Sequence, residues 1–172
     1  MNRNLYLLIV LLLGSSFISC KKSDITHESD YDKSYKSWVA FKTSSNNSYR
    51  YKVSFTSWTG YSTETVITVK DGKVVGRSYV AKTVEHPSNS VLVREEWTED
   101  ESTLNTHANG DPSATLDEIY DRAKNQWLLK RKDAEVYLET KNNGMISSCG
   151  FVPKNCADDC FRGIHISLIE AM

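Results

Sequence analysis

The sequence lacks an excess of positive charge, the motifs of common enzymes and, beyond its N-terminal segment, any long hydrophobic run. No later stretch approaches 18 consecutive apolar residues, so we expect no membrane-spanning helix there. The formal net charge is −1 without a concentrated basic patch, which argues against a nucleic-acid partner. Neither H-E-x-x-H, G-x-S-x-G nor a glycine-rich phosphate loop occurs. We therefore assign no catalytic residue, no metal ligand and no cofactor from motifs.

The N-terminal segment has the order of a secretory signal. Arg3 precedes an unbroken apolar run, residues 5–13, and small polar residues lead from it towards Cys20. Nine apolar residues rise only about 13 Å as a helix, against roughly 30 Å of hydrocarbon. Residues 1–19 are thus predicted to be a signal peptide. The cysteine that ends the segment resembles the lipobox cysteine of bacterial lipoproteins, which is lipidated and becomes the mature N-terminus.

This resemblance implies where the protein resides. Acylation of Cys20, for example with palmitate, would anchor the chain in the membrane of the cell envelope, and we expect the outer membrane. Residues 20–30 are polar without apolar periodicity, which predicts a lipidated N-terminus followed by a short tether. Residues 31–172 then have the length of a single domain.

Helical periodicity appears twice in this domain. Tyr31, Tyr35 and Trp38 follow i, i+4, i+7 spacing, which predicts an amphipathic helix over residues 30–43 with an aromatic core face. A capping box formed by Thr115 and Glu118 opens a second helix, predicted over residues 116–128.

The remaining patterns have a period of two residues, which is typical of strands with one buried face. Asp71-Gly72 and Asn143-Gly144 are hairpin signals, and residues 99–113 are polar and irregular, which predicts a loop. In the last strand we expect Ile164, Ile166 and Leu168 to point inward. The predicted order is one helix, four strands, one helix and three strands, hence an α+β fold with two helices on one face of an antiparallel sheet of about seven strands. The predicted strands are 49–56, 61–70, 73–82, 91–97, 134–140, 145–151 and 163–169.

Three cysteines lie close together near the C-terminus. In an exported protein such a cluster favours a disulfide, and three thiols leave at least one without an intramolecular partner. Cys149 ends one predicted strand and Cys160 precedes its partner strand, so a hairpin brings these two into bridging range. We expect a Cys149–Cys160 bond; Cys156 is the alternative partner of Cys160 or the free thiol.

The same segment permits a different chemistry. Cys149, Cys156, Cys160 and His165 form a possible Cys3His zinc set, although their spacing matches no established ligand pattern. Asp158 and Asp159 are adjacent, so on an extended chain their carboxylates point to opposite faces and are expected to be solvated. His165 is expected to face outward from its strand. The disulfide is the favoured interpretation of this segment.

One short aromatic segment suggests a contact surface. Trp58 and Tyr61 flank the Thr59-Gly60 turn and, if exposed, would form a small patch for a glycan or an envelope protein. Together with the absent motifs, this favours a non-catalytic binding or envelope-accessory module. The alternatives are an inhibitor of a periplasmic enzyme that presents its hairpin tips, and a small zinc-dependent enzyme centred on residues 149–165.

The domain also resembles a family of small, uncharacterised bacterial lipoproteins. The resemblance implies the lipid anchor and the antiparallel sheet, but it implies no activity. The opening Cys20-Lys-Lys-Ser is similar to lipoproteins of the Bacteroidetes. The motifs that carry the family resemblance are Trp38, Tyr49-Arg-Tyr51, the V-x-V-x-D-G-x-V-like hairpin of residues 66–74, the T-x-D-E start of the helix at Thr115, and the acidic pair Asp158-Asp159.

Overall fold

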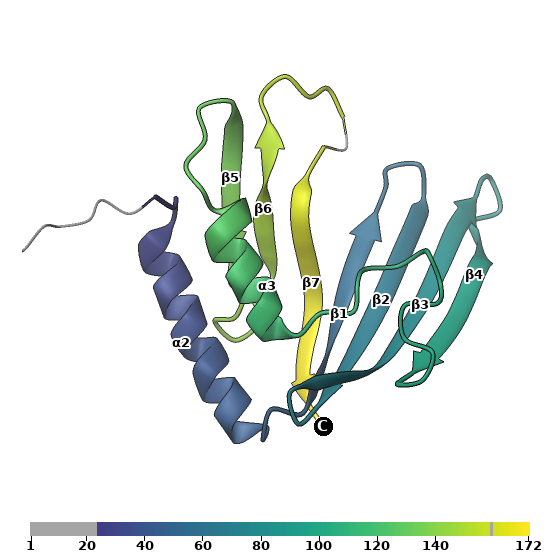
Figure 1. Cartoon of the computed structure of the whole chain (residues 1–172). Helices are drawn as coiled ribbons and strands as arrows, with labels where there is room; N and C mark the ends of the chain where they lie inside the picture. The colour runs from purple at the N-terminus through teal and green to yellow at the C-terminus, as the bar shows by residue number, and fades with distance from the viewer. Residues whose placement is uncertain (1–23, 159) are drawn as a thin grey trace, which may run out of the picture.

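The fold is an antiparallel sheet with two helices on one face (Figure 1). The computed structural model describes residues 24–158 and 160–172; the predicted signal peptide and Cys20 lie outside the described residues. The sheet order is β4-β3-β2-β1-β7-β6-β5, and every neighbouring pair is antiparallel. This confirms the predicted fold class and element order. The elements are α2 (Glu28–Ser44), β1 (Tyr49–Thr56), β2 (Tyr61–Lys70), β3 (Lys73–Glu85), β4 (Ser90–Asp100), α3 (Leu116–Arg122), a π-helical turn (Ala123–Trp127), β5 (Ala134–Glu139), β6 (Ser148–Pro153) and β7 (Arg162–Ala171).

The core lies between the helices and the β1 and β7 side of the sheet. Trp38 of α2 is fully buried and packs edge-on against Tyr49 of β1 and face-on against Tyr120 of α3, with ring centroids 5.2 and 6.2 Å apart. Its indole N–H donates to Asp117 in the first turn of α3. The predicted capping box of Thr115 and Glu118 is present and starts this helix. Of the predicted aromatic stripe of the first helix, Tyr31 and Trp38 are thus core, whereas Tyr35 is 43% exposed and stacks on Tyr31.

The domain begins earlier than the predicted tether allows. Ile25 is buried and pairs with Leu129, while the amide of Thr26 donates to the carbonyl of Leu128. Residues 24–27 are therefore attached to the folded domain. A single apolar residue in a polar stretch carries no periodicity, which is why the sequence pattern did not reveal this attachment.

The strand predicted over residues 145–151 starts later, at Ser148. Asn143 and Gly144 adopt positive φ as expected, but Asn142 extends the turn by donating its side-chain amide to the carbonyls of Ile146 and Ile166. The amide of Ile146 binds the Tyr120 hydroxyl instead of a neighbouring strand. Side-chain bonds have replaced strand pairing at this end of the hairpin.

β7 contains a bulge that alters its inward-facing residues. Lys52 pairs with Leu168, whereas the next residue, Val53, pairs with Ile166, which leaves Ser167 as an extra residue. Ile166 and Ile169 point inward, and Leu168 is 40% exposed. The prediction that Leu168 points inward is wrong because one extra residue shifts the alternation beyond it.

Candidate functional site

The site begins where β1 and β7 stop pairing. Their ladder runs from Tyr49–Ala171 to Val53–Ile166 and ends at the bulge. β1 continues to Thr56 with β2 as its partner, and β7 starts at Arg162 with β6 as its partner. Within the described residues, no strand therefore pairs with the facing sides of residues 54–56 and 162–165. Figure 1 shows the two strands diverging in this region, because a bulge bends the strand that carries it.

A cavity of about 450 Å³ lies between these two strand ends. Its β1 wall is formed by residues 53–56, and its opposite wall by residues 161 and 163–165. Gly163 has no side chain because a Cβ there would lie 2.1 Å from the carbonyl oxygen of Cys149 on β6. The cavity wall at this position is bare main chain. We call this cavity the β1–β7 cleft.

Asp111 contributes a carboxylate to the β1–β7 cleft. One carboxylate oxygen accepts a hydrogen bond from Thr65, and Thr65 in turn accepts one from the Asp111 amide. Burial raises the pKa of Asp111 above its ordinary value, against the lowering effects of Thr65 and Arg77. None of the ion pairs found in the described part of the chain includes Asp111. Asp111 thus lies outside these ion pairs, although the charge of the nearby Arg77 acts on it.

A buried ion pair holds the loop that carries Asp111. Arg77 of β3 makes two hydrogen bonds to the carboxylate of Glu99 on β4, of 2.8 and 2.9 Å, and both side chains are almost completely buried. Two further Arg77 N–H groups donate to the carbonyls of His107 and Asp111. The amides of Asn105 and His107 donate to Glu99. The Arg77 guanidinium has the largest effect on Glu99, and together with these amide donors it holds the pKa of Glu99 well below its usual range.

Aromatic stacking covers this ion pair. The Trp97 ring stacks on His107 with centroids 4.5 Å apart, and the Arg77 guanidinium lies 4.7 Å from the Trp97 centroid. Sequence reasoning missed Arg77, Glu99 and Asp111. For Arg77 the available signal was the alternation of its own strand, which places it on the same face as the buried Tyr79 and Ala81. Thr65 is buried, because it lies opposite Val53 in the β1–β2 register.

The cleft continues towards the helices. A small cavity of about 70 Å³ shares Val53, Asp111, Gly163 and Ile164 with it and adds side chains from the second helical segment. Two of these, Arg122 and Trp127, come from the end of α3 and the π-helical turn. π-Helical turns are rare and frequently occur at functional sites.

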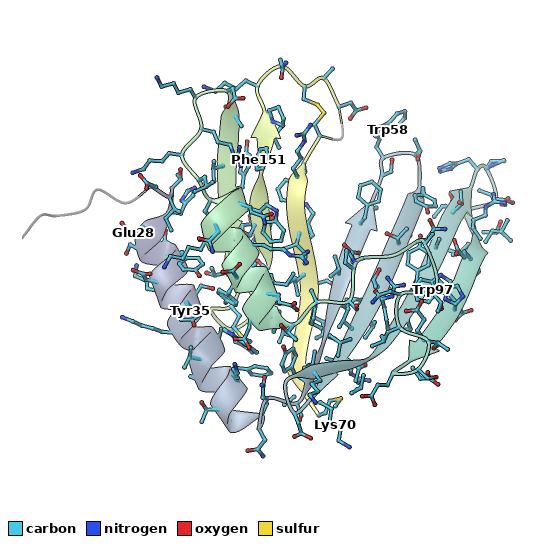
Figure 2. The ribbon with its side chains drawn as sticks, in the orientation of Figure 1. Glu28, Tyr35, Trp58, Lys70, Trp97 and Phe151 are labelled. Atoms are coloured by element: carbon cyan, nitrogen blue, oxygen red, sulfur yellow. A yellow bond between two sulfur atoms is a disulfide. The ribbon has the colours of Figure 1, made fainter. Side chains whose placement is uncertain are left out.

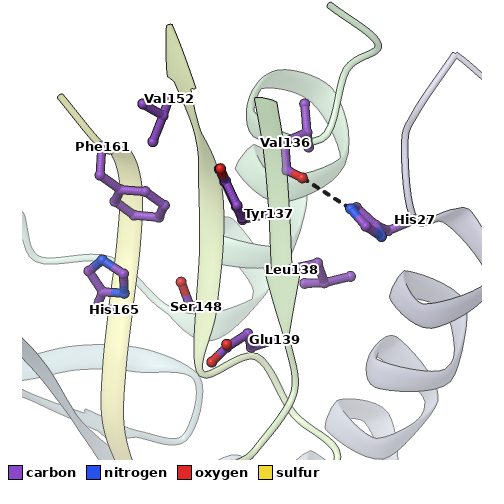
Figure 3. A pocket seen from close by; sticks show the side chains of 9 residues that line it. All are labelled: His27, Val136, Tyr137, Leu138, Glu139, Ser148, Val152, Phe161 and His165. Atoms are coloured by element: carbon purple, nitrogen blue, oxygen red, sulfur yellow. Dashed lines mark hydrogen bonds between the residues drawn. The ribbon is translucent and has the colours of Figure 1, made fainter. Parts of the chain in front are cut away.

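A second pocket, of about 460 Å³, lies around the β5 edge of the sheet (Figure 3). His165 stacks on Phe161 with centroids 4.2 Å apart, and both rings line this pocket as well as the cleft. Partial burial lowers the pKa of His165, which Glu139 opposes. His165 faces outward, as we expected.

The same pocket contains Ser148, but not in a catalytic arrangement. In the strand register Ser148 lies opposite both Glu139 and His165, so serine stands between the acid and the base. A nucleophilic triad needs the histidine in the middle position. Glu139 is bound to Lys141 at 2.8 Å instead. Glu139, Ser148 and His165 therefore do not form a nucleophile–base–acid relay.

The predicted aromatic pair is divided between two environments. Trp58 lies in the β1–β2 turn, 81% exposed, and stands at the tip of that hairpin in Figure 2. Tyr61 is half-buried, and its hydroxyl lies 3.4 Å from that of Tyr79. Of the predicted pair only Trp58 is exposed; Phe55 of β1 is also 44% exposed.

The disulfide joins Cys156 to Cys160, with Cα atoms 6.1 Å apart. The expected Cys149–Cys160 bond is wrong, because Cys149 pairs with Leu138 and Ile164 inside the sheet and its side chain points into the core. Burial raises the pKa of the Cys149 thiol to about 12. Cys149 is the free cysteine of the cluster.

The Cys156–Cys160 disulfide also argues against the possible Cys3His zinc site. Cys156 and Cys160 are bonded to each other, and Cys149 faces away from His165 across the sheet. Among the described residues no group of three or more His, Cys, Asp or Glu side chains is placed to hold a metal ion. Asp158 is exposed, as expected, and Asp159 lies outside the described residues.

The comparisons with known proteins leave the site to be interpreted from its own geometry. No protein-family model, curated protein or solved structure matches the chain. Within residues 24–158 and 160–172, neither helix has the length and apolar character needed to span a bilayer.

Proposed function

We propose that this chain is an exported lipoprotein, anchored through Cys20 in the cell envelope, whose domain is a non-catalytic binding module. The β1–β7 cleft is its binding site. The observation that carries this proposal is Asp111, which lines the cleft and belongs to no ion pair among the described residues, while the two strand ends beside it pair with no described strand across the cleft. Asp111 is half-buried, and the desolvation of its carboxylate, which Arg77 offsets in part, costs free energy that a cationic ligand would offset further.

The position of Asp111 supports binding more than structure. A buried ion pair, two stacked rings and a network of main-chain bonds all hold the loop that carries it. Pre-organised polar groups in a cavity of several hundred Å³ are the usual form of a ligand site. Glu139, Ser148 and His165 lack the spatial order needed for nucleophilic catalysis, which favours binding over hydrolysis.

An inhibitor of a periplasmic enzyme is the second candidate. The observation that favours it is the 81% exposure of Trp58 at the tip of the β1–β2 hairpin. Exposed tryptophans commonly anchor protein interfaces. In this function the hairpin tip, and not the cleft, would contact the partner.

Site-specific photo-crosslinking in the envelope separates the two. A photoreactive phenylalanine analogue is placed in the full-length protein at Thr56, in the cleft wall, at Trp58, on the hairpin tip, or at Lys124, an exposed control position. The binding module predicts adducts from Thr56 that Asp111→Asn reduces. Adducts from Trp58 that are insensitive to Asp111→Asn favour the inhibitor. Equal labelling at Lys124 and Thr56, or none at Thr56, contradicts the cleft as the binding site.

A further inference from the structure

We propose that the ligand of the β1–β7 cleft is an extended polypeptide segment with a lysine or arginine side chain, which inserts between β1 and β7 as an additional strand. This inference rests on the proposed binding function and names its ligand class.

The two walls of the cleft are strand ends with one unpaired side each. Residues 54–56 of β1 and 162–165 of β7 have partners on their outer sides, β2 and β6, but none of the described strands pairs with their facing sides. Strand ends of this kind present N–H and C=O groups that another chain satisfies by pairing. Here two such edges face one cavity, so a single inserted strand would meet a ladder on each side.

The length and direction of that strand follow from the register. Three residues of β1 and four of β7 are available, which corresponds to about 10–13 Å of extended chain. β1 and β7 are antiparallel to each other, so the inserted segment runs parallel to one and antiparallel to the other. The bulge at Ser167 opens the sheet at the point where this segment would start.

The side chains around the cleft define the segment further. Thr65 and Val53 are buried on the helix-bearing face, and Asp111 is bonded to Thr65. Because successive side chains of a strand point to opposite faces, one residue of the segment faces Asp111 and its neighbours face the outward side. A cationic side chain is required opposite the carboxylate. Its neighbours would meet the Phe161 and His165 stack.

The regular spacing of main-chain groups on the cleft walls favours a polypeptide over a sugar. The groups of β1 and β7 that face the cleft alternate with the spacing of a strand, which the main chain of an extended peptide matches. A glycan lacks this regular alternation of donors and acceptors.

Binding of peptide pools tests the proposal. The full-length protein in detergent micelles is mixed with fluorescent eight-residue peptides that are acetylated, amidated and randomised except for Arg, Gln or Glu at position five. We expect the Arg pool to bind more tightly than the Glu pool. In Asp111→Asn this preference should fall about tenfold or more, while the matched variant Asp32→Asn, which removes an exposed carboxylate from α2, should retain it.

Two further measurements do not depend on that variant. Hydrogen exchange should show added protection within residues 54–56 and 162–165 when the Arg pool is bound, and N-methylation of alternate peptide amides should abolish binding. No binding by any pool, equal binding of the Arg and Glu pools, or binding without added protection would each overturn strand insertion. Thr56 adducts with a non-peptide ligand would overturn it too, yet leave the binding function intact. If the Thr56 adducts and peptide binding are both absent, the binding function and strand insertion are both contradicted.

Discussion

At the scale of single residues, Arg77 and Glu99 determine where Asp111 lies. Their paired hydrogen bonds are buried, and Arg77 also holds the main chain of the loop at His107 and Asp111. Removing one member of a buried pair leaves the other charge without compensation. We expect Arg77→Met to lower the midpoint of thermal unfolding by on the order of 10 °C, measured by circular dichroism. Arg94→Met, which removes an exposed pair with Glu85, should change it by less than about 2 °C. Equal shifts in both variants would contradict the structural role of Arg77.

The same pair predicts an acid-sensitive fold. The pKa of Glu99 is lowered in the folded state, so its contribution is present above its ordinary pKa of 4.5 and is lost as the pH falls below that value. The pKa of Asp100 is also lowered in the folded state, so this group likewise destabilises the fold as the pH falls, whereas the raised pKa of Asp111 has the opposite effect on the pH dependence of stability. We expect the free energy of unfolding in urea to fall between pH 5 and 3 and to fall less in Glu99→Gln. A slope unchanged by Glu99→Gln would show that other carboxyls cause it.

The cysteines give a further residue-scale prediction. Cys149 is buried with its pKa raised to about 12, and the other two cysteines of the cluster are bonded. Ellman's reagent should detect no thiol from the cluster in the native protein and one after unfolding without reductant. Peptide mapping should assign that thiol to Cys149, and Cys149→Ser should remove it. A reactive thiol at Cys156 or Cys160 in the unreduced protein would contradict the pairing.

At the scale of elements, local patterns predicted the type and order of helices and strands well. Asp71-Gly72, the Thr115–Glu118 box and the alternation in β1 all act between near neighbours in sequence. The bulge at Ser167 depends on β1, more than a hundred residues earlier, so no local pattern announces it. The Arg77–Glu99 pair likewise needs the β3–β4 register. The cleft and the Asp111 carboxylate that lines it therefore could not be predicted from the sequence, although the sequence contains every residue that forms them.

The bulge itself can be removed. Deleting Ser167 restores regular alternation through Ile166 and Leu168, which would let Ser54 and Phe55 pair with β7 and close the cleft. We expect the deletion variant to fold, to protect the amides of residues 54–56 from hydrogen exchange and to lose Thr56 adducts. Ser167→Ala, which retains the extra residue, is the control. An unchanged exchange pattern in the deletion variant would mean that the bulge does not hold the strands apart.

At the scale of the whole molecule, the proposed anchor and the domain make separate predictions. Acylation at Cys20 should place the protein in the membrane fraction with a mature mass that starts at Cys20. Cys20→Ala should leave this fraction while it retains the unfolding midpoint of the domain, because the described core is built from residues between Ile25 and Ile169. A chain that still begins at Met1, or a Cys20→Ala protein that remains lipidated, would contradict the lipoprotein assignment.

The central claim is that the sheet parts between β1 and β7, and amide hydrogen exchange of the unliganded full-length protein tests it most directly. In the ladder of Tyr49–Val53 with Ile166–Ala171 we predict slow exchange on both sides of β1. Within residues 54–56 and 162–165 we predict fast exchange at the alternate amides that face the cleft, beside slow ones bonded to β2 and β6. Uniformly slow exchange along both strands would show a closed sheet and contradict the account.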